Sequence, residues 1–527
     1  MYTHETNLKV DRFLGIRLLN PIVDMQNGYL SAYDAKNVEL RYAETSSNVG
    51  IYSMKGRQKI ATLEGKKIIG QWESIQLGVR YWLVYAIDDA KGYLYHYKPS
   101  AGTFDLLYDD LSPVPKANGI TTAQGFDDVF VFTNGVDDYV AVMMSADEKC
   151  KCLDAVDAEG RNIRGLILKM HNGRLVTNCG NRIHWSRTGD IYDWSSSDTG
   201  YVTNAAYQEF DSDVTAAEVY GDALVVFTNT HSVQFQGNPG DVSSFSRSEA
   251  TGGGCAGPMA VCKFDNKLFY YDAKARNVFA YYLYDSGQTR PSDGLAGNML
   301  KFFAQIDENK LGQISIVAVS SSNKSELWFH LPLLEGSVIL IYDYLKQEWV
   351  CRDMGPLTSI QAISGDVYGA HEDMLVKEDS GDTVLGEFYP CEYTCHTIDL
   401  GSDSNLKIPK MPLIFTFDTH YSNNFSLEFM IDERTDTAKI KRIEKQGDAF
   451  LIWATEDGAI GGVWAHDDGE GGYYWNYDDA FDSTYNLHGL VPFRQLRLKF
   501  YTEKSGDSFG IKRIEMKRVK IKTKMIG

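Results

Sequence analysis

A repeated eight-residue segment is the feature of this chain that most constrains its fold. Residues 127–134 (DDVFVFTN) recur as residues 222–229 (DALVVFTN), with five of the eight positions identical and an offset of 95 residues. About 47 residues after the first copy, residues 172–178 (NGRLVTN) show the same pattern of a polar turn followed by a short apolar strand. Weaker copies follow the same pattern at residues 79–85, 266–272, 325–330 and 365–368.

Each copy is flanked by further short strands. A second turn and strand follow at residues 92–97, 181–185, 232–235, 277–280 and 337–341, and a strand precedes the copy at 68–72, 214–219 and 314–319. Three or four short strands every 45 residues or so are typical of propeller blades. A small blade cannot bury both of its apolar faces alone, whereas blades stacked around an axis bury one another. We therefore predict a β-propeller-like array of about six or seven blades over residues 61–392; a sandwich array with Greek-key strands is the alternative.

The pattern changes after the propeller-like region. Residues 411–417, 425–430, 493–501 and 509–516 alternate apolar and polar side chains, which is typical of half-buried antiparallel strands. We predict a separate C-terminal antiparallel β-sandwich over residues 393–527, so the whole chain is all-β. Residues 1–60 are predicted to be an extended docking segment. The basic residues near the C-terminus, Lys517 to Lys524, fit either a basic arm or a terminal strand with one solvated face.

An acidic, glycine- and aromatic-rich insertion at residues 457–482 interrupts the sandwich pattern. It contains no Lys or Arg. Glycine-rich segments resist a fixed structure, while clustered aromatic side chains favour burial, so a tip that docks on a partner reconciles the two. A loop without a role is the alternative. The candidate residues for channel lining or partner docking are Asp457, Asp467, Asp468, Glu470, Asp478, Asp479, Asp482, Trp464 and Trp475.

The charge and cysteine content exclude several classes of protein. The formal net charge of −19 argues against a general nucleic-acid-binding role, because phosphate neutralisation needs a basic surface. It fits a channel that DNA passes without sticking, and it equally fits ordinary solubility. Eight scattered cysteines are too few for a disulfide scaffold, so we expect reduced thiols. We expect neither a signal peptide nor a transmembrane helix, because the chain has no apolar run of sufficient length.

Catalytic and cofactor motifs are missing from the sequence. There is no Walker motif or His-Glu-x-x-His, and residues 252–257 (GGGCAG) resemble a dinucleotide fingerprint without a following helix. Residues 196–200 (SSDTG) match only the first part of an Asp-box, a sialidase turn. Adjacent carboxylates such as Asp137 and Asp138 say nothing about the spacing of 5 to 10 Å that glycosidases need. The group at 467–470 lacks the spacing of an EF-hand. We predict a protein that is not an enzyme, with no catalytic residues, cofactor or metal.

Two stretches resemble a known family. Residues 24–38 (DMQNGYLSAYDAKNV), followed by 50–56 (GIYSMKG), are similar to the N-terminal signature of tail nozzle or hub proteins of short-tailed phages, the packaged-DNA stabilisation family. In this chain Ile51 and Lys55 replace the Leu and Arg that are usual there. Residues 173–194, which contain a Gly-Arg-Leu and an Ile-His-Trp-Ser motif, and residues 224–236 resemble a blade of the same family.

The resemblance implies a structural virion protein assembled in the host cytoplasm. It implies a homo-oligomer, a hexameric ring below the portal and adaptor, that lines the DNA exit channel, retains the packaged genome and carries a tail tip or fibres. Double-stranded DNA would pass without sequence-specific binding, along the oligomer axis, because the hole of a propeller is narrow. The alternative is a carbohydrate-binding or glycoside-cleaving propeller.

Overall fold

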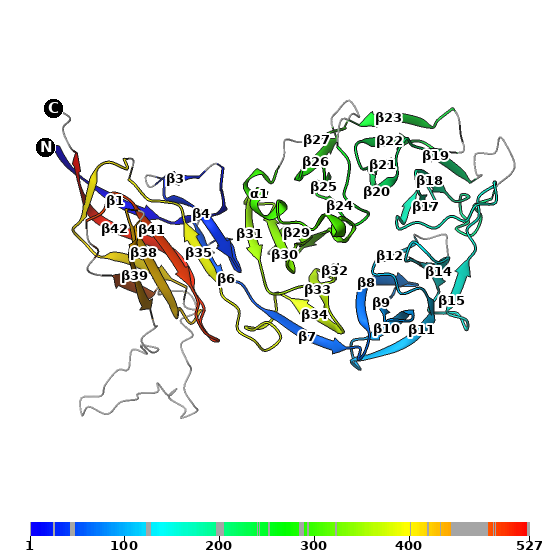
Figure 1. Cartoon of the computed structure of the whole chain (residues 1–527), viewed down its shortest axis with the longest axis horizontal. Coiled ribbons are helices and arrows are strands. Elements are labelled where there is room, and N and C mark those ends of the chain that lie inside the picture. The colour runs from blue at the N-terminus through cyan, green and yellow to red at the C-terminus, as the bar shows by residue number, and fades with distance from the viewer. Residues whose placement is uncertain are drawn as a thin grey trace, which may run out of the picture. The chain divides into compact units, whose positions relative to one another are not determined.

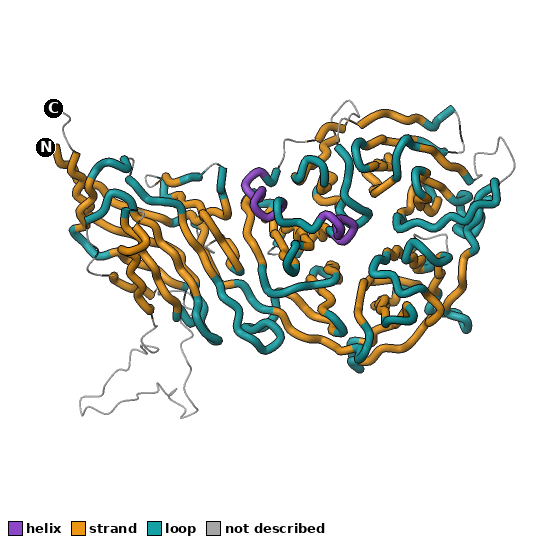
Figure 2. Tube along the Cα trace, in the orientation of Figure 1, coloured by secondary structure: helices purple, strands orange, loops and turns teal. Residues whose placement is uncertain are grey.

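The computed structural model divides the chain into two compact units. Unit 1 combines Met1–Met54 with Glu387–Gly527, and unit 2 is Lys55–Gly386, so unit 2 is an insertion within unit 1. The structure describes residues 2–19, 21–24, 27–42, 48–122, 128–195, 205–239, 241, 243–250, 253–283, 289–291, 295–321, 324–400, 402–418, 421–432, 434–443, 483–487, 490 and 492–523. Strands make up most of the regular structure in both units (Figure 2).

Unit 2 is a β-propeller, as the repeat predicts. Its described strands form seven four-stranded antiparallel blades arranged around a common centre (Figure 1); six are separate sheets, and β28 to β31 make up the seventh set. The first blade consists of β8 (Lys67–Gln76), β9 (Val79–Ile87), β10 (Gly92–Lys98) and β11 (Thr103–Leu111). The second consists of β12 (Asn118–Thr121), β13 (Phe130–Thr133), β14 (Tyr139–Val142) and β15 (Cys150–Leu153). The third consists of β16 (Lys169–His171), β17 (Arg174–Cys179), β18 (Arg182–Trp185) and β19 (Ala206–Glu209).

The remaining blades complete the circle. The fourth blade consists of β20 (Val214–Tyr220), β21 (Ala223–Thr228), β22 (Ser232–Gln236) and β23 (Ser246–Ala250), and the fifth of β24 (Val261–Phe264), β25 (Lys267–Asp272), β26 (Asn277–Leu283) and β27 (Thr289–Pro291). The sixth consists of β28 (Ser315–Ser320), β29 (Ser325–Pro332), β30 (Ser337–Asp343) and β31 (Glu348–Arg352). The seventh consists of β32 (Ser359–Ile363), β33 (Asp366–His371), β34 (Met374–Glu378) and β7 (Arg57–Thr62). Three short helices, η1 (Gly297–Met299), α1 (Leu300–Phe303) and η2 (Glu308–Gln313), lie between β27 and β28 in the described chain. None of the described helices is long and apolar enough to cross a membrane.

The last blade closes the ring with a strand from the beginning of the unit. β7 pairs antiparallel with β34, so the first strand of unit 2 completes a sheet whose other strands come from its end. Among the first strands of the blades, β8 contacts β12, the strands β16, β20, β24, β28 and β32 contact one another in that order, and β32 contacts β8 across the closure. These first strands therefore surround the centre of the ring.

Apolar side chains fill the spaces between blades. Trp72 and Tyr85 of the first blade pack with Phe130 and Phe132 of the second, and further clusters lie between the next two pairs of blades. At the closure, Ala61 of β7 belongs to a cluster shared by the seventh and first blades. This burial between stacked sheets supplies the main stabilisation of the array, since each blade alone would expose two apolar faces.

Unit 1 is a β-sandwich. Its strands are β1 (Tyr2–Val10), β2 (Arg12–Ile16), β3 (Val23–Asp24), β4 (Tyr29–Lys36), β5 (Val38–Tyr42), β6 (Val49–Ser53), β35 (Glu392–Cys395), β36 (Leu406–Pro409), β37 (Leu413–Phe417), β38 (Phe425–Ile431), β39 (Arg434–Ile443), β40 (Ser483–Leu487), β41 (Leu496–Tyr501) and β42 (Gly510–Thr523). One layer has the order β39-β38-β41-β35-β4, and the other is built on β42 and β37. Phe415 of β37 packs on Phe500 of β41, and these strands do not pair, so their rings meet between the layers.

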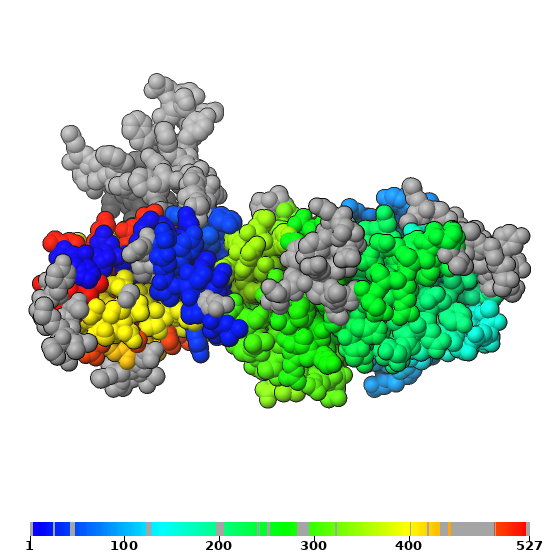
Figure 3. Space-filling model, turned by 90° about the horizontal axis from the view of Figure 1, so that it is seen from above, coloured from blue at the N-terminus to red at the C-terminus, as the bar shows by residue number. Residues whose placement is uncertain are grey.

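The N-terminal residues do not form the separate docking segment that we predicted over residues 1–60. β1 runs antiparallel along β42, with Tyr2 opposite Thr523 and Val10 opposite Ile514. The first and last parts of the chain therefore lie side by side (Figure 3). Leu8, Val10 and Phe13 are buried, so this segment contributes to the sandwich core. The unit boundaries at residues 54/55 and 386/387 also differ from the predicted 60/61 and 392/393.

The basic residues near the C-terminus lie on a strand. β42 pairs with β1 along one edge and with β36 and β37 along the other. Val519 and Ile521 are buried, while Lys517 and Arg518 are exposed. Of the two interpretations of the described basic residues, the structure supports the terminal strand with one solvated face. Lys524 lies outside the described residues.

Candidate functional site: the axial pocket of the propeller

The site residues predicted from sequence lie outside the described residues. These are Asp457, Asp467, Asp468, Glu470, Asp478, Asp479, Asp482, Trp464 and Trp475. Their segment connects β39 with β40, which pairs with β37 in the sandwich. The role predicted for this segment therefore remains a prediction.

The carboxylate pair Asp137 and Asp138 supports local structure. Asp137 accepts hydrogen bonds from the backbone N–H of Ser112 at 2.6 Å and from Asn134 Nδ2 at 2.7 Å. Burial alone would raise the pKa of Asp137, but these hydrogen bonds outweigh it and the pKa is lowered. Asp138 instead binds Arg164, with Oδ1 and Nη2 2.8 Å apart. A carboxyl group with a lowered pKa is unsuited to act as a general acid near neutral pH.

A pocket opens at the centre of the propeller, where the first strands of the blades begin. Its free volume, counted for the centres of water-sized atoms, is about 70 Å³, and it is partly open to solvent. Its wall comes from β8, β32 and the segments that lead into β12, β16, β24 and β28. The lining residues are Ile69, Gly70, Gln71, Trp72, Pro115, Lys116, Ala117, Leu166, Pro258, Met259, Gly312, Gln313, Ser315, Thr358, Ser359, Ile360 and Gln361.

Three polar atoms in this lining have no hydrogen-bond partner among the described residues: Gln71 Nε2, Ser315 Oγ and Ser359 Oγ. Gln71 is only 2% exposed and Ser315 only 6%. The indole N–H of Trp82 donates to Gln71 Oε1 at 3.3 Å. Because an indole nitrogen can only donate, this bond fixes the amide so that its NH₂ group is the unpartnered end. Unpartnered buried polar atoms are costly, and they mark places where a water or ligand is expected.

The hydroxyl of Thr358, in the same lining, does form hydrogen bonds. Its Oγ1 lies 2.7 Å from the carbonyl oxygen of Ile68 and 3.1 Å from that of Ala370. These bonds tie the start of β32 to β8 and β33, and leave the hydroxyl donor engaged. The neighbouring Ser359 hydroxyl differs in having no hydrogen-bond partner among the described residues, although its oxygen is buried.

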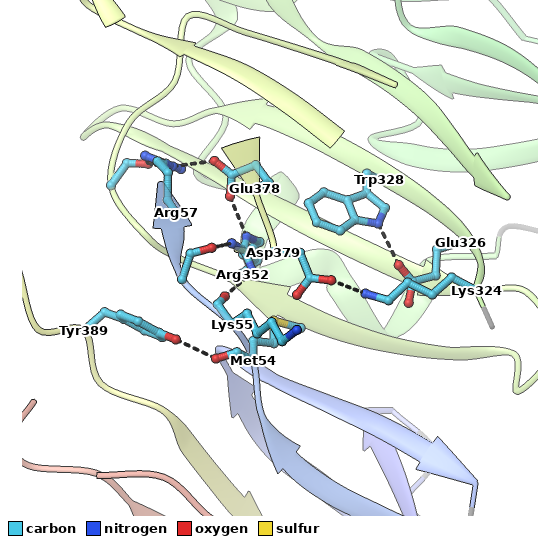
Figure 4. Close-up of polar contacts among 12 residues, drawn as sticks. Met54, Lys55, Arg57, Lys324, Glu326, Trp328, Arg352, Glu378, Asp379 and Tyr389 are labelled. Atoms are coloured by element: carbon cyan, nitrogen blue, oxygen red, sulfur yellow. Dashed lines mark hydrogen bonds and ion pairs between the residues drawn. The ribbon is translucent and has the colours of Figure 1, made fainter. Parts of the chain in front are cut away.

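A buried ion cluster holds the closing blade to its neighbour (Figure 4). Glu378 of β34 lies between Arg57 of β7 and Arg352 of β31, and binds Arg352 Nε through Oε2 at 2.7 Å. The three side chains are at most 2% exposed. Burial lowers the pKa of Arg57, although the charge of Glu378 opposes this effect. The cluster thus joins β7 to β31 and β34, which lie about 300 residues later in the chain.

The backbone at the start of unit 2 is part of this cluster. Arg352 donates from Nη2 to the carbonyl oxygen of Gly56 at 2.7 Å and from Nη1 to that of Lys55 at 3.0 Å. A Cβ on Gly56 would lie 2.0 Å from the carbonyl oxygen of Thr383, so only glycine fits there. The final glycine of the 50–56 stretch therefore permits close approach of two backbones at the ring closure.

The second stretch that resembles the nozzle family also forms framework. Arg174, at the start of β17, is fully buried and donates from Nη1 to the carbonyl oxygen of Ser186 at 2.9 Å. The Ser186 hydroxyl in turn accepts from the backbone N–H of Leu175 at 3.0 Å. The Gly-Arg-Leu and Trp-Ser motifs thus bind each other within one blade.

Sequence reasoning did not identify the pocket residues. Gln71, Lys116, Ser315 and Ser359 lie in different blades and share no motif. The repeat places Gln71 and Ser315 on or next to predicted first strands, but nothing local indicates which of their groups lack partners. Only the ring closure brings them together.

Comparisons with known proteins do not establish a family. No family model matches the chain, and no curated protein matches it. A solved structure described as "AfRom2 CNH domain" is similar, with 8% sequence identity and a TM-score of 0.38, over 62% of this chain and 99% of that chain. We draw no argument from so weak a likeness, and the propeller assignment rests on the strand pairings.

Proposed function

We propose that the chain is a structural subunit of a phage tail nozzle, a ring that lines the DNA exit channel and joins the portal and adaptor to the tail tip or fibres. The observation that carries the proposal is the resemblance of residues 24–38, 50–56, 173–194 and 224–236 to nozzle proteins, together with the structural role of matching residues. Arg174 and Ser186 brace a blade, and Gly56 lies at the ring closure. Framework positions of this kind suit a wall-forming subunit.

The charges described in the propeller also support a structural role. Asp137, Asp138 and the Arg57–Glu378–Arg352 cluster are engaged in contacts that hold strands and turns together. The net charge of −19 suits a surface past which DNA moves without adhering. The ring would be a homo-oligomer, a hexamer on the resemblance, and DNA would follow the oligomer axis.

The size of the assembled particle tests this proposal. Native mass spectrometry and negative-stain imaging of the purified chain should show six-fold rings with an axial hole, and purified virions should contain peptides of this chain. A monomer that is absent from virions and that binds or hydrolyses glycans would contradict the proposal and favour the carbohydrate-active alternative.

The acidic segment at residues 457–482 is tested separately. Changing its seven acidic residues to Asn or Gln should increase retention of double-stranded DNA by the ring at low salt, because repulsion is removed. Changing Asp89, Asp147 and Glu148, three exposed acidic residues of the propeller, is the control. Equal retention of DNA by the two variants would remove the support for a channel role of this segment, and it would leave the proposal of a ring-shaped assembly unaffected.

A further inference from the structure

Strand β42 of the sandwich carries a concentration of basic side chains on its solvent side. Its inward row consists of buried apolar residues, Ile511, Ile514, Met516, Val519 and Ile521. The remaining side chains between them and at the end of the strand are half-buried or exposed, and they are Lys512, Arg513, Glu515, Lys517, Arg518, Lys520 and Lys522. All of these except Glu515 are basic, although the whole chain has a net charge of −19. The outer surface of β42 therefore has the opposite charge to the protein as a whole.

Two irregularities in strand pairing raise the density of this charge. Opposite β1, the register shifts so that Lys517 and Arg518 both face the single residue Asn7. Arg518 has a positive φ of 56°, and its backbone N–H donates to Asn7 Oδ1 at 3.0 Å. Opposite β37, a second shift adds Lys512 beside Arg513. Bulges often protect the free edge of a sheet, but β42 is paired along both edges. Each bulge here places two consecutive basic residues outside the core.

Several of these cations lack a counter-charge. Lys517, Lys520 and Lys522 form no ion pair within the described part of the chain. Arg518 Nε lies 3.5 Å from a Glu5 carboxylate oxygen at the surface, and an exposed pair of this kind contributes little. The outer face of β42 therefore offers at least three cations to a partner.

The propeller carries an acidic counterpart on its rim. β11 is the outermost strand of the first blade, and none of the described strands pairs with its outer edge (Figure 1). Its register also shifts, so that Tyr93 of β10 faces both Asp109 and Asp110. These two carboxylates are exposed, and neither forms an ion pair with a described residue. Leu106 of the same strand is 53% exposed. The rim therefore offers a pair of adjacent carboxylates and an apolar side chain.

We propose that the outer face of β42 on one copy of the chain binds the acidic rim strand β11 of a second copy. Most of the net charge of −19 lies within residues 55–386, so the propeller of a neighbouring copy attracts the basic face. Binding of nucleic acid to β42 would leave the acidic pair of β11 without a role, whereas a contact between copies uses both bulged strands.

The contact is of the kind that builds rings. Two different surfaces of each copy take part, so the arrangement is head-to-tail, and it closes where the rotation between copies permits. This inference rests on the proposed ring, and it names the contact that joins the subunits.

Charge reversal of each surface tests the contact. One variant carries Lys517→Glu with Arg518→Glu, and the other carries Asp109→Lys with Asp110→Lys. Each variant alone should self-associate at least about a hundredfold more weakly than the wild type in sedimentation velocity, because like charges then meet. An equimolar mixture of the two should assemble again, since the reversed face of the first variant meets the reversed rim of the second.

A matched control carries Lys59→Glu with Lys91→Glu. Both are exposed lysines of the propeller, and the change in net charge equals that of the β42 variant. This control should assemble like the wild type, and circular dichroism should show the same β-structure in every variant. Undiminished assembly of the two test variants, or a mixture that fails to assemble, would overturn the contact and leave the proposed ring in place.

Two further outcomes separate this contact from other possibilities. A wild-type chain that stays monomeric up to about 100 µM would contradict the proposed ring together with the contact. Binding of double-stranded DNA that is lost in the Lys517→Glu and Arg518→Glu variant, with assembly unchanged, would assign the basic face to nucleic acid and overturn the inference. Assembly that weakens as NaCl is raised from about 0.1 to 1 M is expected, because salt screens exposed charges.

Discussion

Arg57 and Glu378 are 321 residues apart in the chain, and their side chains form a buried ion pair where the propeller ring closes. Arg352 completes the cluster from a third strand and also binds the backbone of Gly56. Neutral packing could replace such a cluster without loss of stability, but removing one member leaves a buried charge without a partner. The cluster therefore makes the closure sensitive to single changes.

Replacing Glu378 with Gln should destabilise the propeller by about 3–5 kcal/mol, because two buried guanidinium groups lose their common counter-charge. Urea unfolding followed by tryptophan fluorescence measures this, since six of the nine tryptophans lie within residues 55–386. Asp366→Asn is the matched control. Asp366 is half exposed and pairs with Lys377 on the surface, so this change should cost no more than about 1 kcal/mol. Equal effects of the two changes would show that the cluster does not hold the closure.

Replacing Arg174 with Lys should cost about 1–3 kcal/mol in the same measurement. Arg174 donates to Ser186 and, through Nη2, to Asn238 Oδ1 at 2.9 Å, and lysine cannot reproduce this planar geometry. Burial lowers the pKa of Arg174 to about 10. Arg187→Lys, at a half-exposed position that pairs with Asp193, should change stability by less than about 0.5 kcal/mol. A stable Arg174→Lys variant would contradict the bracing role.

The propeller could be predicted from sequence because each blade repeats a local pattern. The seven predicted copies are the second strands of the seven described blades, from β9 to β33, and residues 127–134 and 222–229 contain β13 and β21. A turn followed by an apolar strand is a local sequence pattern, so its repetition along the chain can be recognised without knowledge of long-range contacts.

The closure and the sandwich could not be predicted in this way. β7 pairs with β34, and β1 pairs with β42, across most of the chain. The local sequence of these strands does not indicate which strand each of them pairs with. The pocket has the same origin, because Gln71 and Ser315 come to line one pocket only when the ring closes. Long-range pairing therefore accounts for what local patterns missed.

Acidification should destabilise the propeller through two buried histidines. Burial lowers the pKa of both His184 and His330 to about 4, compared with about 6.5 in the unfolded chain. The unfolded state therefore binds more protons between pH 6.5 and 4, so the stability contribution is complete above 6.5 and declines as the pH falls towards 4. Each histidine should contribute a loss of about 2 kcal/mol between pH 7 and pH 5. His184→Gln and His330→Gln should each reduce this loss in urea unfolding at the two pH values, and an unchanged loss in both variants would contradict the prediction.

Thiol labelling should separate the cysteines by burial. Cys152 is exposed, whereas Cys255, Cys351, Cys391 and Cys395 are buried. Burial raises the pKa of Cys255 and of Cys395 to about 12, which disfavours their reactive thiolates. Reaction of the native chain with an aromatic disulfide reagent should therefore show a fast phase that disappears in Cys152→Ser, while the buried thiols react only after urea unfolding. Cys395→Ser is the control and should keep the fast phase. A fast phase that persists in Cys152→Ser would contradict the prediction, because it would come from one of the partly exposed thiols, Cys150, Cys179 or Cys262, or from opening of a strand that contains a buried thiol.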